Sequence, residues 1–126
     1  MIELVSCSED ILKTVSTAAR VCYSGSSVDK LMEGFSEEEN RKLIKKVTSM
    51  GHLSVVEHAV FTFSVSKNLK EELFKILQEK PFLNITEEKD EFIVSLNLRT
   101  MKELKMVFPD FEFTKAVSKH IPDWLI

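Results

Sequence analysis

The sequence predicts an α+β protein in which helices pack against a small sheet of mostly antiparallel strands. Residues 60–65 alternate apolar and polar side chains with the two-residue period of a half-buried strand, and residues 92–96 form a second apolar strand. Apolar side chains recur at helical spacing in three longer segments, residues 9–23, 37–50 and 67–79. The complete expected order is strand, helix, helix, strand, helix, strand, strand, helix, helix, which is typical of the α+β class.

The composition describes a single globular domain spanning residues 1–126. A chain of 126 residues buries roughly two thirds of its unfolded surface, and 44% hydrophobic residues describe an ordinary core. The net charge of −3 and the mixing of Lys with Glu give no sign of a nucleic-acid or membrane-surface partner. Cys7 and Cys22 lack CxxC spacing, so we expect no zinc site or disulfide, and a reduced, cytoplasmic protein. No apolar run has the length of a membrane span, and no secretion signal is expected.

The first part of the chain is expected to form a strand and two capped helices. Residues 2–5 open the chain as a short strand, and Ser8 then offers an N-cap for the helix that follows. The second helix has a stronger start signal because Ser36 and Glu39 have the spacing of a capping box. Gly51 stands where a C′ glycine should end this second helix, so the chain turns sharply there.

Side chains suited to a functional site gather at the corner that follows this glycine. His52, Ser54, Glu57 and His58 bring two imidazoles, a hydroxyl and a carboxylate close together in the sequence. The spacing is not H-E-x-x-H, and the adjacent Glu57 and His58 point to different sides of any regular element, so we predict no metal site. Ser54 and Glu57 repeat the S-x-x-E spacing, which indicates a short helical turn capped by Ser54. On spacing alone, this capped turn is favoured over a catalytic site.

The second half of the chain is expected to contain three helices and three strands. After the strand at residues 60–65, we expect a helix at 67–79 that Pro81 ends. Strands at 82–85 and 92–96 should follow, joined by polar residues 86–90. A helix from Asn97 to about Val107 and a last short helix at 113–120 complete the chain. Judged on their own, Cys22 is a buried thiol on an apolar helical face and His120 a helix-end histidine.

Three segments of the sequence resemble the flavin-dependent thymidylate synthase family. Ala18-Ala19-Arg20-Val21-Cys22-Tyr23 resembles that family's A-A-R-x-C/S-Y/F helix. Gly51-His52-Leu53-Ser54-Val55-Val56-Glu57-His58 resembles its G-H-x-S/T-x-x-E-H motif, and Phe61-Thr62-Phe63 resembles the F-T-F strand that follows it. Val94-Ser95-Leu96-Asn97-Leu98-Arg99-Thr100 is similar to a later strand-to-helix segment with an N-x-R pattern. The resemblance implies a fold like that of the thymidylate synthase complementing proteins.

The resemblance also implies a chemistry and a set of ligand contacts. Members of the family make dTMP from dUMP with the carbon of methylenetetrahydrofolate and the hydride of reduced FAD. FAD is thus the implied cofactor, a nucleotide or flavin the implied ligand, and a homo-oligomer the implied assembly. N-caps and an arginine supply hydrogen-bond donors and positive potential, which suit an anionic dinucleotide. No catalytic residue is assigned, and the residues that match cofactor-binding positions are His52, Ser54, Glu57, Asn97, Arg99 and, at a small-residue position nearby, Cys22.

The sequence departs from the family at the positions that grip dUMP. The R-H-R-x-x-S signature should begin where this chain has Lys75-Ile76-Leu77-Gln78-Glu79-Lys80-Pro81, and a later arginine is replaced by Phe108. A charge-assisted hydrogen bond contributes roughly 1.5–3 kcal/mol, so losing three of them weakens nucleotide binding by about 10³–10⁶-fold. We therefore predict a truncated homologue with weak or no catalytic activity. Two alternatives stay open: a synthase completed by a partner chain, and a non-catalytic oligomerisation or nucleotide/flavin-binding module.

Overall fold

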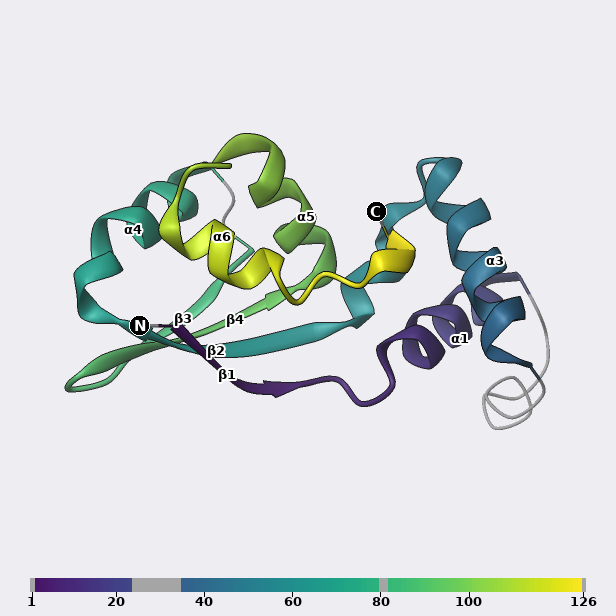
Figure 1. The fold of residues 1–126 in the computed structure, drawn as a ribbon, viewed down its shortest axis with the longest axis horizontal. Helices are drawn as coiled ribbons and strands as arrows, with labels where there is room; N and C mark the ends of the chain where they lie inside the picture. Colours follow the sequence, from purple (N-terminus) through teal and green to yellow (C-terminus); the bar gives the residue numbers. More distant parts are fainter. Residues whose placement is uncertain (1, 24–34, 80–81, 126) are drawn as a thin grey trace.

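A four-stranded antiparallel sheet organises the structure (Figure 1). The structure is a computed structural model that describes residues 2–23, 35–79 and 82–125, without the side chains of residues 22 and 23. The strands follow the order β1-β2-β4-β3 across the sheet. Each neighbouring pair runs antiparallel, which confirms the α+β class predicted from the sequence. The strands are β1 (Ile2–Cys7), β2 (Val60–Ser66), β3 (Asn84–Glu87) and β4 (Glu91–Asn97).

The helices fall into two groups. α4, α5 and α6 lie over one face of the sheet, whereas α1 and α3 pack against each other beyond the junction of β1 and β2 (Figure 1). Short 3₁₀ helices connect these parts, and η3 contacts α3. The helices are α1 (Ile11–Tyr23), α3 (Glu37–Ser49), α4 (Lys70–Glu79), α5 (Leu98–Val107), α6 (Glu112–Ser118), η1 (Leu53–His58), η2 (Lys67–Leu69) and η3 (Asp123–Leu125).

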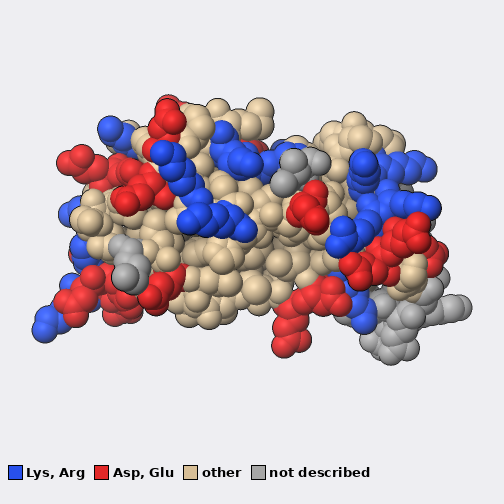
Figure 2. Space-filling view, viewed as in Figure 1, with Lys and Arg blue, Asp and Glu red and all other residues tan. Residues whose placement is uncertain are grey.

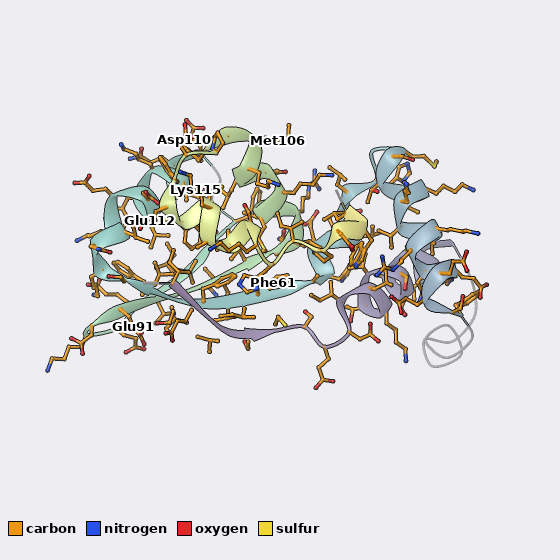
Figure 3. All side chains as sticks on the ribbon, in the orientation of Figure 1. Phe61, Glu91, Met106, Asp110, Glu112 and Lys115 are labelled. Atoms are coloured by element: carbon orange, nitrogen blue, oxygen red, sulfur yellow. The ribbon has the colours of Figure 1, made fainter. Side chains whose placement is uncertain are left out.

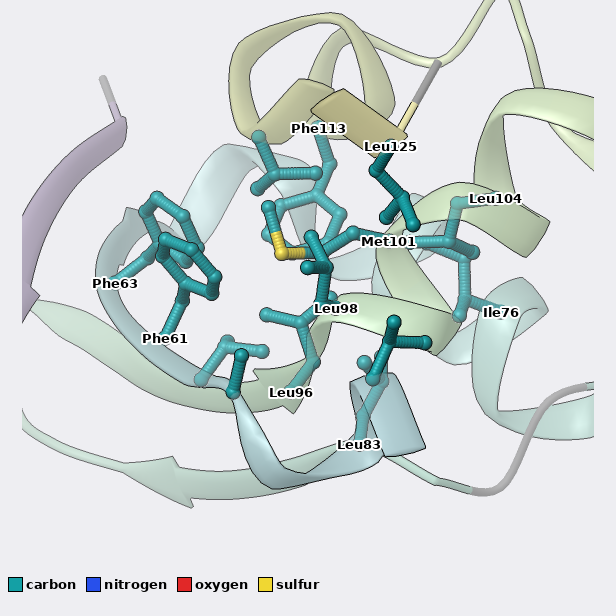
Figure 4. Close-up of a cluster of buried hydrophobic side chains, with 14 of the residues drawn as sticks. Phe61, Phe63, Ile76, Leu83, Leu96, Leu98, Met101, Leu104, Phe113 and Leu125 are labelled. Carbon is teal, nitrogen blue, oxygen red and sulfur yellow. The ribbon is translucent and has the colours of Figure 1, made fainter. Parts of the chain in front are cut away.

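The core lies between the sheet and the helices that cover it. The two central strands place every second side chain into this core, as the period-2 pattern predicted. Phe63 on β2 pairs with Val94 on β4, and both are fully buried. Apolar side chains from α4, α5 and α6 complete the cluster (Figure 4), which includes Phe61, Phe63, Ile76, Leu96, Leu98, Met101, Leu104 and Phe113.

The opposite face of the sheet is polar and half-buried. Thr62 and Ser95, directly opposite each other on β2 and β4, are joined by a hydrogen bond of 2.8 Å between their hydroxyls. Ser64 donates a hydrogen bond to Glu91 farther along the same pair of strands. Acidic and basic side chains lie next to each other over the surface seen in Figure 2. Within the described ranges, no helix is long and apolar enough to cross a membrane.

Three local signals in the sequence are confirmed by the structure. Ser36 and Glu39 form the complete capping box of α3, with both hydrogen bonds at 3.1 Å. Gly51 follows this helix with φ of +83°, a left-handed conformation that an L side chain rarely adopts. The Asn97 Oδ1 atom accepts a 2.9 Å hydrogen bond from the Thr100 N–H and so caps α5.

The predicted cap at Ser8 is wrong because Ser8 takes part in the sheet instead. The Ser8 N–H donates to the Val60 carbonyl at 3.0 Å, and the Val60 N–H donates to the Ser8 Oγ at 2.9 Å. These two bonds extend the pairing of β1 with β2. Asp10, at φ of 41°, serves as the cap, since its Oδ1 accepts a 3.2 Å bond from the Lys13 N–H. A pairing with a distant strand thus outweighs the nearby sequence signal.

Two further expectations need correction. The predicted turn after Gly51 exists as the 3₁₀ helix η1, but its N-cap is His52, and the cap makes no side-chain hydrogen bond. Ser54 therefore lies inside η1 rather than capping it. The strand expected at residues 82–85 begins at Asn84 and runs to Glu87, because pairing with β4 fixes which residues are extended.

A carboxylate from α4 caps the N-terminus of α6. Glu72 accepts hydrogen bonds from the N–H of Glu112, at 3.1 Å, and of Phe113, at 2.9 Å. Glu112 is labelled at the start of α6 in Figure 3. The first N–H groups of a helix need outside acceptors, and a negative charge there also favours the helix dipole. Glu72 therefore joins two helices that the sequence showed only as separate elements.

Candidate functional site

The candidate site forms where the end of η1 meets the start of α5. The Leu98 N–H donates a 2.9 Å hydrogen bond to the Ala59 carbonyl, which fixes the first residue of α5 against the chain that leaves η1. Glu57 lies on η1 and Arg99 on the first turn of α5. This backbone bond therefore brings together two side chains that are 42 residues apart in the sequence.

Arg99 is held by two carboxylates. Its Nη1 donates to the Glu57 Oε2 at 2.8 Å, and its Nε lies 3.4 Å from the Glu103 Oε1. The hydrogen bond to Glu57 raises the pKa of Arg99 above its ordinary value, and the charges of both carboxylates act in the same direction. The side chains of Arg99 and Glu57 are 39% and 43% exposed, so the pair lies at the rim of the molecule. The positive potential expected at this wall is thus offset by two negative charges.

These side chains line a cavity of about 200 Å³, which we call the Arg99 pocket. Asn97 contributes its carboxamide, whose Oδ1 is already used to cap α5. The Asn97 Nδ2 makes no hydrogen bond to the described residues and can donate to a ligand. Among the described residues, the lining consists of Glu57, Phe82, Asn97, Arg99, Thr100 and Glu103.

Three of the six predicted cofactor-binding residues, Glu57, Asn97 and Arg99, therefore meet in this pocket. The other three do not line it. His52 lines a separate, mainly apolar hollow of about 320 Å³ with Leu43, Lys46, Val47 and Met50. Ser54 is exposed on η1. Cys22 belongs to α1, and its side chain lies outside the described residues.

Sequence reasoning missed three residues of the pocket. Glu103 follows Arg99 by one helical turn, so an i,i+4 ion pair was detectable once α5 was predicted. Thr100 is buried and supplies the N–H that Asn97 accepts. Phe82 gave no signal, because its position depends on where β3 begins. Elsewhere, no group of three or more His, Cys, Asp or Glu side chains among the described residues is arranged to hold a metal ion.

A second arginine organises the corner between α1 and α3. Arg20 donates a hydrogen bond to Asn40 Oδ1, and its guanidinium lies 3.5 Å from the centre of the Phe35 ring. Burial lowers the pKa of Arg20, while the charge of Glu39 acts in the opposite direction. A hollow of about 570 Å³ opens beside this corner, with Asn40, Phe35, Arg41 and Trp124 in its lining.

The fold matches that of a solved enzyme. The crystal structure of a flavin-dependent thymidylate synthase from Helicobacter pylori, complexed with FAD and dUMP, superposes with a TM-score of 0.63 at 13% sequence identity. The superposition covers 96% of this chain and 93% of that one. At this identity the likeness establishes the fold, which is that of the flavin-dependent thymidylate synthases.

The sequence comparisons establish the family. Residues 3–71, more than half of the chain, match the family model of the thymidylate synthase complementing protein, so the chain belongs to that family. Flavin-dependent thymidylate synthases from Geobacter sulfurreducens and Clostridium tetani are 39% identical over 64 residues and 38% identical over 66 residues. These matches cover about half of this chain, but only 28% and 26% of the two relatives. The resemblance predicted from the sequence motifs is thus confirmed.

The matched region and the pocket overlap only in part. Glu57 lies inside residues 3–71, whereas Phe82, Asn97 and Arg99 lie beyond them. The pocket is therefore built from one wall that the family model matches and one wall that it does not.

Proposed function

We propose that this chain binds a flavin nucleotide at the Arg99 pocket and has weak or no thymidylate synthase activity of its own. One observation supports the binding above all others. Glu57 matches one family motif and Asn97 and Arg99 match another, and all three converge on one cavity at the junction of η1 and α5. The solved relative with this fold is complexed with FAD and dUMP, which makes FAD the first ligand to test.

The arginines of this chain support the proposal of weak activity. The sequence contains only Arg20, Arg41 and Arg99. Arg20 donates to Asn40, Arg41 pairs with Glu37 and Asp123, and Arg99 pairs with Glu57 and Glu103. A bidentate guanidinium is the side chain best suited to phosphate, and lysine does not reproduce its geometry. Each arginine here already has an internal partner, which reduces the positive potential that it offers to a phosphate.

Exposed apolar side chains favour a second candidate function, a homo-oligomeric interaction module. Met106 is 78% exposed and projects from α5 away from the sheet (Figure 3). Met50 and Val5 are also largely exposed, at 61% and 58%. Three statements stay predictions: that residues 1–126 form one domain, that the chain forms a homo-oligomer, and that the protein is cytoplasmic. Light scattering of the purified protein tests the homo-oligomer.

A flavin titration tests the main proposal. We expect added FAD to acquire a shifted absorbance band and a higher fluorescence anisotropy with the wild-type protein. Arg99→Gln should weaken FAD binding about 10-fold or more, since a hydrogen bond to a charged group contributes roughly 1.5–3 kcal/mol. Arg41→Gln is the matched control, because Arg41 pairs with exposed carboxylates away from the pocket.

Complementation of a thymidine auxotroph tests the activity. We expect no rescue by this chain. Rescue by the chain alone would overturn the proposed loss of activity, and rescue only beside a full-length homologue would favour a site completed by a partner chain. The flavin proposal would be overturned if the wild-type protein, at saturating concentration, bound no FAD and if Arg99→Gln and Arg41→Gln gave the same result as wild type. The oligomerisation module would then be the remaining candidate function.

A further inference from the structure

We propose that the Arg99 pocket takes an uncharged, planar, hydrogen-bonding ring stacked on Phe82, and that it excludes the phosphate groups of the same ligand. This inference rests on the proposed function, because it states which part of a flavin or nucleotide enters the pocket. It follows from three properties of the lining: its charge, its exposed aromatic ring and its size.

The charge of the lining disfavours phosphate. Among the described lining side chains Arg99 is the one cation, and Glu57 and Glu103 supply two negative charges, so these six side chains together carry a formal net charge of −1. A phosphate that entered would be repelled by both carboxylates. It would also compete with Glu57, whose Oε2 accepts a 2.8 Å hydrogen bond from the Arg99 Nη1. An uncharged ring meets neither obstacle.

Phe82 offers the aromatic surface. Its side chain is 68% exposed at the rim of the pocket, although water contact is unfavourable for a ring of this size. The next residue, Leu83, is only 8% exposed and anchors this segment in the core. Asn84 then begins β3 by pairing with Ser95. The buried side chain of Leu83 and the strand pairing of Asn84 thus hold Phe82 beside the pocket. A flat ring stacked on Phe82 would remove one face of its side chain from water.

The remaining donors and acceptors suit the edge of a heterocycle. The Asn97 Nδ2 has two N–H groups, and the Arg99 Nη2 has two more that make no bond to the described residues. The carboxylate of Glu57 can accept a ring N–H. The imide of a flavin or a uracil presents two carbonyl acceptors and a ring N–H donor, and an adenine presents ring-nitrogen acceptors and the N–H donors of its exocyclic amino group.

The size of the pocket decides between a ring and a whole dinucleotide. A volume of about 200 Å³ lies below the usual range of roughly 300–1,000 Å³ for drug-sized ligands. One ring system therefore fits, while a ribose and a diphosphate would extend into solvent. This placement keeps the negative charges of the ligand away from Glu57 and Glu103.

Phosphate-free probes test this inference in the full chain. Binding of riboflavin, adenosine and uridine is measured by flavin fluorescence and by ligand NMR, and inorganic pyrophosphate is measured alone and as a competitor. We expect at least one ring to bind, and Phe82→Ala to weaken it about 5- to 150-fold, the range measured for bases stacked on aromatic side chains. Phe82→Trp should retain the affinity and, with riboflavin, quench the flavin more strongly.

The control variant is Phe74→Ala, which removes an exposed phenylalanine from α4 outside the pocket. Melting curves confirm that each variant folds. Equal affinities for Phe82→Ala and Phe74→Ala, or tight binding of pyrophosphate that displaces the ring, would overturn the inference. If Phe82→Ala left the affinity for FAD unchanged, the inference would be overturned but the proposed function would stand. Conversely, a ring that binds through Phe82 while FAD does not bind would end the proposed function and keep the inference. If no ring and no FAD bind, both are wrong.

Discussion

Arg20 and Arg99 each join two segments that are distant in the sequence, yet their surroundings differ. Arg20 lies in the corner of α1 and α3, where its partners are the neutral amide of Asn40 and the ring of Phe35. Arg99 lies at the junction of η1 and α5, where its partners are two carboxylates. The pKa of Arg20 is lowered by burial, whereas the pKa of Arg99 is raised by its hydrogen bond to Glu57.

This difference separates a structural joint from a binding site. A half-buried guanidinium with a buried amide partner stabilises packing, since losing the partner leaves polar groups unsatisfied. A half-exposed guanidinium between partly exposed carboxylates contributes little to stability because water and salt screen it. The N–H groups of the Arg99 Nη2 make no bond to the described residues and can donate to a ligand. Mutations at the two places should therefore affect different measurements.

The largest effect on stability is expected in the corner of α1 and α3. Asn40 is 7% exposed and accepts the hydrogen bond of Arg20. Asn40→Ala should lower the free energy of unfolding by about 1.5–3 kcal/mol, because it removes a bond to a charged group. Urea unfolding measures the loss. Asn68→Ala, which changes an exposed asparagine in η2, is the control and should stay within about 0.5 kcal/mol. A loss at Asn40 no larger than the control value would contradict the structural role of this joint.

The next effect is expected at Gly51, which links the corner to the pocket. Gly51 has φ of +83°, and a Cβ added there would meet nothing within 4 Å. Gly51→Ala should therefore cost about 1–2 kcal/mol from backbone strain alone, measured by urea unfolding. Gly51→Asn is the matched variant and should cost less, since asparagine tolerates this conformation better. A larger loss for asparagine than for alanine would show that something other than the backbone conformation matters at this position.

A smaller effect is expected at the start of α3. Ser36→Ala should lower stability by about 1 kcal/mol, because it removes the acceptor for the Glu39 N–H. Differential unfolding of wild type and variant at neutral pH measures this. Ser49→Ala, in the last turn of the same helix, serves as a control without an N-cap role. A loss confined to Ser49→Ala would be inconsistent with the capping box.

The same capping box predicts a pH dependence. Hydrogen bonds from Ser36, first from its backbone N–H and then from its side chain, hold the pKa of Glu39 below its ordinary value. A folded-state pKa below the unfolded-state pKa gives a stabilisation that is complete above the unfolded value. The stabilisation is lost as the pH falls through the folded value. The stability difference between wild type and Glu39→Gln should therefore shrink in acid, and a difference that grows in acid would contradict the sign.

Sequence patterns were sufficient for features that depend on neighbouring residues. Helical and strand periods gave the element order, and the caps at Ser36 and Asn97 lie within three residues of the N–H groups they accept. Features that depend on distant partners were missed or misassigned. Ser8 pairs with Val60 instead of capping α1, and Glu72 caps α6 from another helix. No local pattern encodes such partners.

The candidate site shows the same division. Family motifs singled out Glu57, Asn97 and Arg99, which the structure places in one pocket. The motifs did not show that Glu57 neutralises Arg99, because this depends on the backbone bond between Leu98 and Ala59. They also gave no indication of Phe82, whose place depends on the register of β3 with β4. The pairing of Glu57 with Arg99 and the place of Phe82 therefore came from tertiary structure, whereas the i,i+4 spacing of Glu103 and Arg99 can be seen in the sequence.

The smallest effect on stability, and the largest on ligand choice, is expected for Glu57→Gln. The ion pair with Arg99 is half-exposed, so its loss should cost only about 0.2–1 kcal/mol. The same change raises the formal net charge of the six described lining side chains from −1 to zero. A phosphate beside Arg99 then meets one carboxylate fewer, and the affinity of AMP relative to adenosine should increase.

Glu38→Gln is the control, since Glu38 forms an exposed ion pair with Lys42 on α3, away from the pocket. Urea unfolding at low and high salt, together with NMR titration of both ligands, separates the two consequences. A loss of stability for Glu57→Gln well above 1 kcal/mol would make Arg99 a structural joint like Arg20. An unchanged AMP-to-adenosine ratio would show that the charge of Glu57 does not govern which ligands enter, because removing that charge is the main electrostatic change that this substitution makes.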